Sequence, residues 1–160
     1  MAYKVFMSYA TTDLPIANHV KQLLADASIE VYVAAHSLWP GATINQALVK
    51  EIESCDLFML LWGRNSKASE WVSQEIGIAT HAKKTILPVV LEPNLNLPGF
   101  IKELKCISVY ENPESALNWL RVNVFERARE KQQRDGLTWL GIGAAVLWLF
   151  SRGGDEDDET

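Results

Sequence analysis

Residues 56–61 read DLFMLL, and this short, almost continuously apolar run decides the fold. A second run of the same kind, TILPVVL, covers residues 85–91. Strands that helices cover on both faces have this character, whereas a strand with one solvated face alternates apolar and polar residues. The two runs therefore predict central strands of a parallel sheet.

Other β-type runs and helical patterns surround these two strands. Further strands are predicted at 4–8, 31–33 and 106–110, and helices at 14–27, 43–54, 69–82, 98–104 and from 112 onward. Asp13 and Ser69 are predicted as N-caps, and Asn112-Pro113 as the start of the last helix. Strands that alternate with helices indicate an α/β fold with helices on both faces of a parallel sheet. Five such strands most often adopt the flavodoxin-like order.

Composition excludes several classes of function. The chain has 160 residues, of which 48% are hydrophobic and 22% charged, so one globular domain can bury its own core. A net charge of −5 argues against nucleic-acid binding, which needs a basic face. Cys55 and Cys106 lack CxxC spacing and the three histidines lie far apart, so no disulfide scaffold and no metal site are predicted. The cysteine content indicates a reducing compartment.

Charge divides the chain into segments. Residues 1–135 are nearly neutral, whereas the excess acid lies beyond an uncharged stretch of 16 residues. We predict a domain over 1–125, a charged helical linker over 126–135, an apolar helix over 136–151 as a candidate membrane anchor, and an acidic disordered tail over 152–160.

The role of the apolar helix has two interpretations. Its 16 residues would span about 24 Å, less than the ~30 Å hydrocarbon core of a membrane. It either inserts in the membrane or packs on the domain or on another protomer. More basic residues precede the helix than follow it, so a spanning helix would keep the domain in the cytoplasm, tail-anchored to the inner membrane.

Ligands of open parallel sheets bind outside the carboxyl ends of the strands. Here those ends are predicted at residues 8–13, 34–42 and 63–69. The sequence there contains neither the GxGxxG fingerprint of dinucleotide-binding folds nor a phosphate-binding GxxxxGK[ST] loop. The GxSxG elbow of α/β-hydrolases is also absent from the sequence. The sequence therefore argues against a dinucleotide-binding enzyme, a nucleotide-binding enzyme with a phosphate-binding loop, and an α/β-hydrolase.

The informative segment is SEWVSQEIGIA at residues 69–79. Trp71 and Glu75 are four residues apart, so they share one face of the predicted helix. A carboxylate on a face suited to packing is costly unless it is paired, and such groups are often functional. Two other interpretations are open. Glu75 lies on the helix surface beside a packed tryptophan, or it pairs with Lys83 or Lys50.

Three short motifs occur in a familiar order. Ser8-Tyr9, Pro40-Gly41 and the Trp71-x-x-x-Glu75 helix resemble the three boxes of a TIR (Toll/interleukin-1 receptor) domain. The run ILPVV at 86–90, followed by LPG at 97–99, is similar to bacterial members of this family. The resemblance covers roughly Tyr3 to Phe125 and implies a flavodoxin-like sheet.

The resemblance also implies a reaction. Enzymatic TIR domains cleave the nicotinamide–ribose bond of NAD⁺, which is their substrate, and they need neither a metal nor a separate cofactor. The glutamate that matches Glu75 is their catalytic residue. Ser8, Tyr9 and Ala10 match the first loop, which would contact the nucleotide.

Two tryptophans have open roles in this interpretation. Trp71 either supports the carboxylate by packing or is an ordinary core aromatic residue. Trp39 is either a stacking surface for an aromatic ring of the nucleotide or a contact between protomers. The loop with Pro40-Gly41 commonly mediates TIR–TIR assembly in the family, so self-association is expected.

Three functions follow as expectations. The first is an NAD⁺ glycohydrolase or ADP-ribosyl cyclase in bacterial antiphage defence signalling. The second is a membrane-tethered, non-enzymatic TIR–TIR interaction module of the adaptor or virulence type, which the lack of Asp and Arg at residues 35–39 favours. The third is a membrane-perturbing effector in which the C-terminal segment acts and the TIR domain regulates it.

Overall fold

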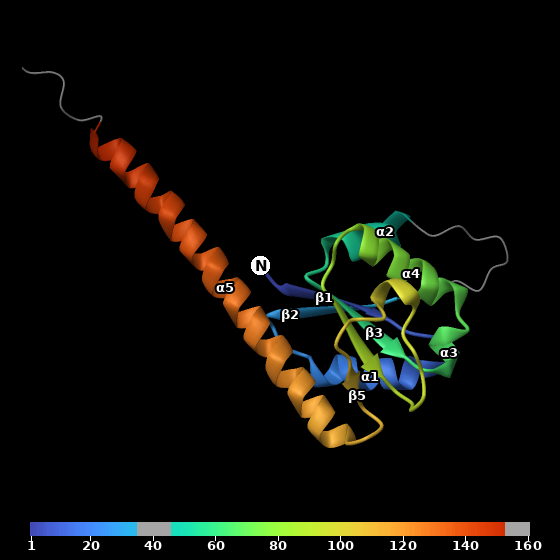
Figure 1. Ribbon diagram of the computed structural model, residues 1–160. Helices are drawn as coiled ribbons and strands as arrows, with labels where there is room; N and C mark the ends of the chain where they lie inside the picture. The colour runs from blue at the N-terminus through green and yellow to red at the C-terminus, as the bar shows by residue number, and fades with distance from the viewer. Residues whose placement is uncertain (35–45, 153–160) are drawn as a thin grey trace, which may run out of the picture.

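A computed structural model describes the backbone of residues 1–34 and 46–152, and the side chains of residues 1–34 and 46–137 (Figure 1). The elements, in chain order, are β1 (Tyr3–Ser8), a 3₁₀ turn η1 (Thr11–Asp13), α1 (Leu14–Leu23), β2 (Ile29–Val33), α2 (Gln46–Ser54), β3 (Leu57–Trp62), α3 (Arg64–Lys67), α4 (Glu70–His81), β4 (Ile86–Val90), a 3₁₀ turn η2 (Gly99–Ile101), β5 (Ile107–Ser108) and α5 (Pro113–Arg152).

The strands form one parallel sheet in the order β2-β1-β3-β4-β5. This is the flavodoxin-like order, so the predicted fold class is confirmed. The apolar runs are β3 and β4, which lie inside the sheet and whose residues are mostly buried. Because both faces of an inner parallel strand are covered, nearly every side chain in such a strand is apolar.

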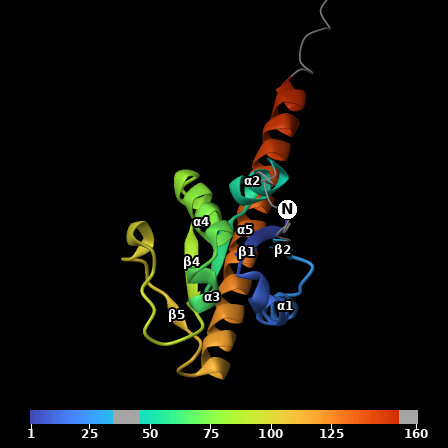
Figure 2. The ribbon, with the colours of Figure 1, turned by 90° about the vertical axis from the view of Figure 1, so that its right-hand side faces the viewer.

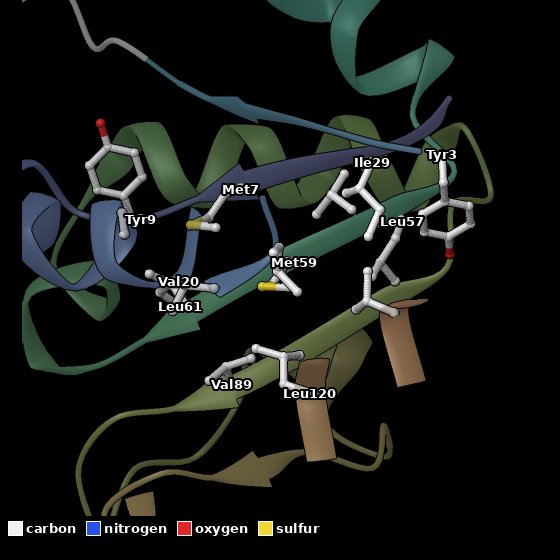
Figure 3. Packing of buried hydrophobic residues seen from close by; sticks show 14 of the residues in the cluster. Tyr3, Met7, Tyr9, Val20, Ile29, Leu57, Met59, Leu61, Val89 and Leu120 are labelled. Carbon is white, nitrogen blue, oxygen red and sulfur yellow. The ribbon is translucent and has the colours of Figure 1, made fainter. Parts of the chain in front are cut away.

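One face of the sheet packs against α1 and α5. Side chains of alternate strand residues, among them Met7, Met59 and Leu61, point to this face (Figure 3). Val20 of α1 and Leu120 of α5 are each 1% exposed in the same cluster. The periodicity of a strand sends its intervening residues to the opposite face.

The opposite face packs against α2 and α4, which lie together on one side of the sheet, away from α1 (Figure 1). Phe6 stacks on Tyr32 and on Phe58, with ring centroids 5.4 Å apart in both pairs. These offset aromatic contacts join β2, β1 and β3 beneath the helix α4. Glu75, the predicted catalytic residue, lies in α4 on this face.

Several predicted boundaries differ from the structure. The helix predicted at 98–104 is only the 3₁₀ turn η2, and the strand predicted at 31–33 starts at Ile29. Helix α1 ends at Leu23 instead of residue 27. The carboxylate of Asp26 accepts hydrogen bonds from the backbone N–H and the hydroxyl of Ser28, which closes a turn and stops the helix. Strand β5 is only Ile107–Ser108, shorter than the predicted 106–110.

The predicted caps have mixed outcomes. Ser69 accepts a hydrogen bond from Val72 N at 3.4 Å, and Asn112 accepts one from Ser115 N at 3.1 Å, so both predicted starts are confirmed. Asp13 occupies the predicted N-cap position of α1, but its side chain makes no capping hydrogen bond to that helix. Instead, this carboxylate bonds to Asn65 in α3, a short helix that the sequence analysis did not predict.

Helix α5 is one continuous helix of 40 residues that crosses the predicted boundaries at 125 and 135 (Figure 2). One side of the charged run 126–135 contacts the body of the domain. Ala128 is 1% exposed, and the ammonium of Lys131 bonds to Asp56. Beyond this run, α5 projects away from the sheet in both views (Figures 1 and 2).

Several predictions fall on other parts of the chain. Trp39, Pro40-Gly41 and residues 43–45 of the predicted second helix lie outside the described residues, as does the acidic tail from residue 153. The backbone of the predicted apolar helix 136–151 belongs to α5, but its side chains from residue 138 onward are outside the described set. Within the part of the chain that was searched, no helix is both long and apolar enough to cross a membrane.

Candidate active site

Ser8 and Glu75 meet at the carboxyl edge of the sheet, 67 positions apart in the sequence. Ser8 is the last residue of β1, and Glu75 lies in α4, which packs above that strand. The Ser8 hydroxyl donates a hydrogen bond of 2.5 Å to Oε2 of Glu75, and both side chains are fully buried. Hydrogen bonds from a hydroxyl to a carboxylate are the short, charge-assisted kind.

Burial sets the charge of this carboxyl. It raises the pKa of Glu75 from 4.5 to about 7, and the hydrogen bond from Ser8 opposes the rise. Desolvation penalises the ionised form, whereas a donor favours it. Burial therefore moves the ionisation of Glu75 toward neutral pH. Its complete burial excludes the interpretation of Glu75 as a helix-surface residue.

Tyr9 follows Ser8 and turns toward the neighbouring strand. Its phenol donates a hydrogen bond of 2.6 Å to the carbonyl of Ala34, just after β2. Burial raises the pKa of Tyr9, and the nearby charge of Glu75 raises it further. The hydroxyl of Tyr9 is thus engaged by the protein backbone in this structure, and a contact of Tyr9 with a nucleotide stays a prediction.

The remaining predicted site residues have different surroundings. Ala10 is buried, and its carbonyl accepts a hydrogen bond of 2.8 Å from Asp13 N. Trp71 is half-buried in the first turn of α4, four residues before Glu75. Trp39 lies outside the described residues. The structure therefore brings Ser8 together with Glu75 and places Tyr9 beside them, while a nucleotide-binding role for any of these residues stays a prediction.

Sequence reasoning missed a polar pair at the same edge. Asn65 Nδ2 donates a hydrogen bond of 2.9 Å to Oδ1 of Asp13, which joins the turn η1 after β1 to the helix α3 after β3. Asp13 had been assigned to helix capping. A usable signal was present, because polar side chains that follow neighbouring parallel strands lie at one edge of the sheet.

The fold and this edge of the sheet define an α/β domain of flavodoxin-like topology, with an ionisable carboxyl beside the end of its first strand. The model of the TIR domain family matches residues 5–121, so the chain belongs to the TIR domain family. This confirms the family predicted from the three boxes.

A solved TIR-domain structure agrees on the fold. The chain is similar to the TIR domain of the Toll-related receptor TRR-2 from Hydra magnipapillata, with 19% identity, a TM-score of 0.63, and coverage of 80% of this chain and 99% of that one. Weaker similarities, covering little more than half of this chain, are to TIR domains of the activated Roq1 resistosome (23% identity, TM-score 0.46, 57% of this chain and 58% of that one) and to a 2-desoxiribosyltransferase from Leishmania mexicana (15% identity, TM-score 0.44, 56% and 65%). The comparison with curated proteins gives no match.

Proposed function

We propose that this chain is a TIR-domain NAD⁺ glycohydrolase or ADP-ribosyl cyclase with Glu75 as its catalytic residue. The observation that carries the proposal is the Ser8–Glu75 pair, a carboxyl with a pKa of about 7 at the edge of the sheet where ligands of this architecture bind. The family membership supports it, and so does the resemblance of the Trp71-x-x-x-Glu75 helix to the box that carries the glutamate of enzymatic members.

The reaction suits a site with few polar groups. The bond between ribose C1′ and the pyridinium nitrogen breaks, and its electron pair neutralises the nicotinamide, so no acid has to protonate the leaving group. The ribose then carries oxocarbenium character, which the ionised Glu75 stabilises electrostatically. Water that attacks C1′ and loses a proton gives ADP-ribose, whereas attack by a nitrogen of the adenine ring gives a cyclic product.

One structural fact sets a condition on this proposal. The side chain of Glu75 is completely enclosed in the single chain. NAD⁺ can therefore contact the carboxyl only after neighbouring elements move. On the β2 side of this edge, the hydroxyl of Tyr9 holds the carbonyl of Ala34. We expect activity to depend on assembly with further copies of the chain.

The test measures nicotinamide release from NAD⁺ by the purified full chain, with and without a crowding agent that promotes assembly. We expect Glu75→Gln to lower the rate on the order of 10²–10³-fold, as loss of a transition-state-stabilising group does. Glu70→Gln is the matched control, because Glu70 is an exposed carboxylate five residues earlier in the same helix. Equal rates for wild type and Glu75→Gln would remove the assignment.

The enclosure of Glu75 favours a second function, a non-enzymatic TIR–TIR interaction module. In that case, Ser8 and Glu75 form a buried structural pair, and the surface acts by binding other TIR domains. Absence of NAD⁺ loss under all assembly conditions, together with retained self-association in sedimentation experiments, would favour this function.

The proposed biological role is bacterial antiphage signalling, and the similarity of residues 86–90 and 97–99 to bacterial family members supports it. Bacteria that express the wild-type chain should then survive phage challenge better than bacteria that express Glu75→Gln. Cellular NAD⁺ measured during the challenge distinguishes depletion of NAD⁺ from production of a signal.

A further inference from the structure

Asp13 and Asn65 join two loops that flank the candidate site. The carboxylate of Asp13 is largely buried, at 8% exposure, and its Oδ1 accepts the hydrogen bond of 2.9 Å from Asn65. Its Oδ2 is buried without a hydrogen-bond partner in the described part of the chain. A buried carboxylate loses much of its hydration, so the amide of Asn65 contributes strongly to its stabilisation.

On the β1 side, a backbone hydrogen bond connects Asp13 to the chain just after Ser8. Asp13 N donates to the carbonyl of Ala10 at 2.8 Å and closes the 3₁₀ turn η1. Only Tyr9 separates Ala10 from Ser8, the residue that bonds to Glu75. The position of Asp13 therefore fixes the path of the chain that leaves β1.

On the β3 side, Asn65 is tied to α4. Asn65 lies in α3, where the hydroxyl of Ser66 accepts from Gly63 N at 2.6 Å and donates to Gly63 O at 3.0 Å. Ser69 N then donates to the carbonyl of Ser66 at 3.1 Å, and the Ser69 hydroxyl caps α4. These bonds connect Asn65 rigidly to the first turn of the helix that carries Glu75.

The two paths meet at Ser8 and Glu75 and close into a ring. We call it the edge ring, and its members are Ser8, Ala10, Asp13, Asn65, Ser66, Ser69 and Glu75. We propose that Asp13 and Asn65 are positioning residues, which hold Ser8 against Glu75 by closing the edge ring. This inference rests on the proposed function only where catalysis is the readout.

Glu92 also holds α3, and its Oε1 accepts a hydrogen bond of 3.2 Å from Arg64 N. Arg64 Nε pairs with Glu92 Oε2 at 3.0 Å, and the Arg64 side chain is 77% exposed. Exposed ion pairs of this kind contribute little, because water and salt screen them. The bond between Asp13 and Asn65 is part-buried, because Asp13 is 8% exposed whereas Asn65 lies at the surface. Glu92→Gln is the matched control for loosening α3 on its other side.

The experiment uses the full chain and four variants. Asn65→Asp sets two carboxylates against each other and should open the edge ring. The exchange variant, Asp13→Asn with Asn65→Asp, restores one donor and one acceptor at unchanged total charge. Asp13→Asn alone keeps an acceptor oxygen, and Glu92→Gln leaves the ring intact.

Two readouts are needed. The first is the titration of the Glu75 carboxyl by NMR on ¹³C-labelled protein, and the second is the kcat and KM of NAD⁺ cleavage under assembly conditions. We expect Asn65→Asp to raise the pKa of Glu75, because the bond from Ser8 that lowers it is lost. Its kcat should fall on the order of 10-fold to 100-fold with a smaller change in KM, since misplacement of reacting groups acts on the rate.

The exchange variant decides the outcome. Return of both readouts to within about threefold of wild type supports the proposal, because only contacting residues show such coupling. A folded Asn65→Asp variant with the wild-type titration and kcat overturns it, and so does an exchange variant that recovers neither readout. If the wild-type chain does not cleave NAD⁺, the proposed function fails, but the titration still tests the edge ring.

Discussion

Lys131, in the middle of α5, forms an ion pair with Asp56, the residue before β3, with 2.7 Å between Nζ and Oδ2. The same ammonium donates to the carbonyl of Ala2 at 3.0 Å, and the same carboxylate oxygen accepts from Lys4 N at 2.8 Å. Three segments that are distant in the sequence therefore converge at the amino edge of the sheet. This contact fastens α5 to the end of the domain opposite the candidate active site.

We predict that Lys131→Ala destabilises the domain by about 1–3 kcal/mol, because it leaves the partly buried Asp56 without its cation. Arg129→Ala is the control, since Arg129 is an exposed cation of the same helix, and it should change the free energy of unfolding by less than ~0.5 kcal/mol. Urea denaturation followed by circular dichroism measures both values. Equal effects of the two substitutions would contradict the fastening role.

A second prediction concerns stability and pH. The pKa of Glu75 in the folded chain, about 7, exceeds its ordinary value of 4.5, so the folded chain binds this proton more tightly than the unfolded chain. The resulting stabilisation is fully present below pH 4.5 and is lost as the pH rises through 7. At ~1.4 kcal/mol per unit, the loss amounts to about 3 kcal/mol.

The variant Glu75→Gln cannot titrate, so its free energy of unfolding should fall less than that of wild type between pH 5 and pH 8. Urea denaturation at several pH values measures this difference. Glu70→Gln should follow the wild-type curve, because Glu70 is exposed. Parallel curves for wild type and Glu75→Gln would show that Glu75 does not carry the raised pKa.

The pH dependence of catalysis gives a third prediction. If the ionised form of Glu75 stabilises the transition state, NAD⁺ cleavage should increase with pH and reach half of its maximum near the pKa of this carboxyl. Ser8→Ala removes the donor that lowers this pKa, so its profile should shift to higher pH. Ser8→Thr keeps a hydroxyl and should restore the profile. A profile that Ser8→Ala leaves unmoved would separate Ser8 from the titration of Glu75.

Tyr9→Phe provides a fourth prediction. The substitution keeps the buried ring but removes the donor to the carbonyl of Ala34. An unpaired buried carbonyl costs about 1–3 kcal/mol, so the free energy of unfolding should fall by that amount. Tyr110→Phe, at a residue that is 39% exposed, is the control and should have little effect. A Tyr9→Phe variant as stable as wild type would mean that water replaces the phenol.

The sheet was predictable from the sequence, because an inner strand that is buried on both faces is a continuous run of apolar residues. The run at 56–61 had to be apolar on both faces, and it became β3 between two other strands. The capping residues Ser69 and Asn112 were equally predictable, since each bonds to an N–H only three residues ahead. The apolar strand and the two helix caps both depend on residues that are close together in the sequence.

The candidate site was predictable only in part, because its contacts join residues that are distant in the sequence. Spacing placed Glu75 on a packing face of its helix, but the hydroxyl that bonds it comes from Ser8 at the end of another element. Asp13 had a local role available as a helix cap, yet Asn65, 52 positions away, binds it instead. A choice between a local and a distant partner depends on the tertiary arrangement, which spacing along the chain does not contain.

The single helix from Pro113 to Arg152 acts as a lever. At 1.5 Å per residue it is about 60 Å long, and Lys131 fastens it near its midpoint. Because no break interrupts the backbone of α5, any rotation of the sheet swings the far end through a wide arc, roughly 30 Å from the point of attachment. A small change of tilt at the domain is thus converted into a large displacement at the tip.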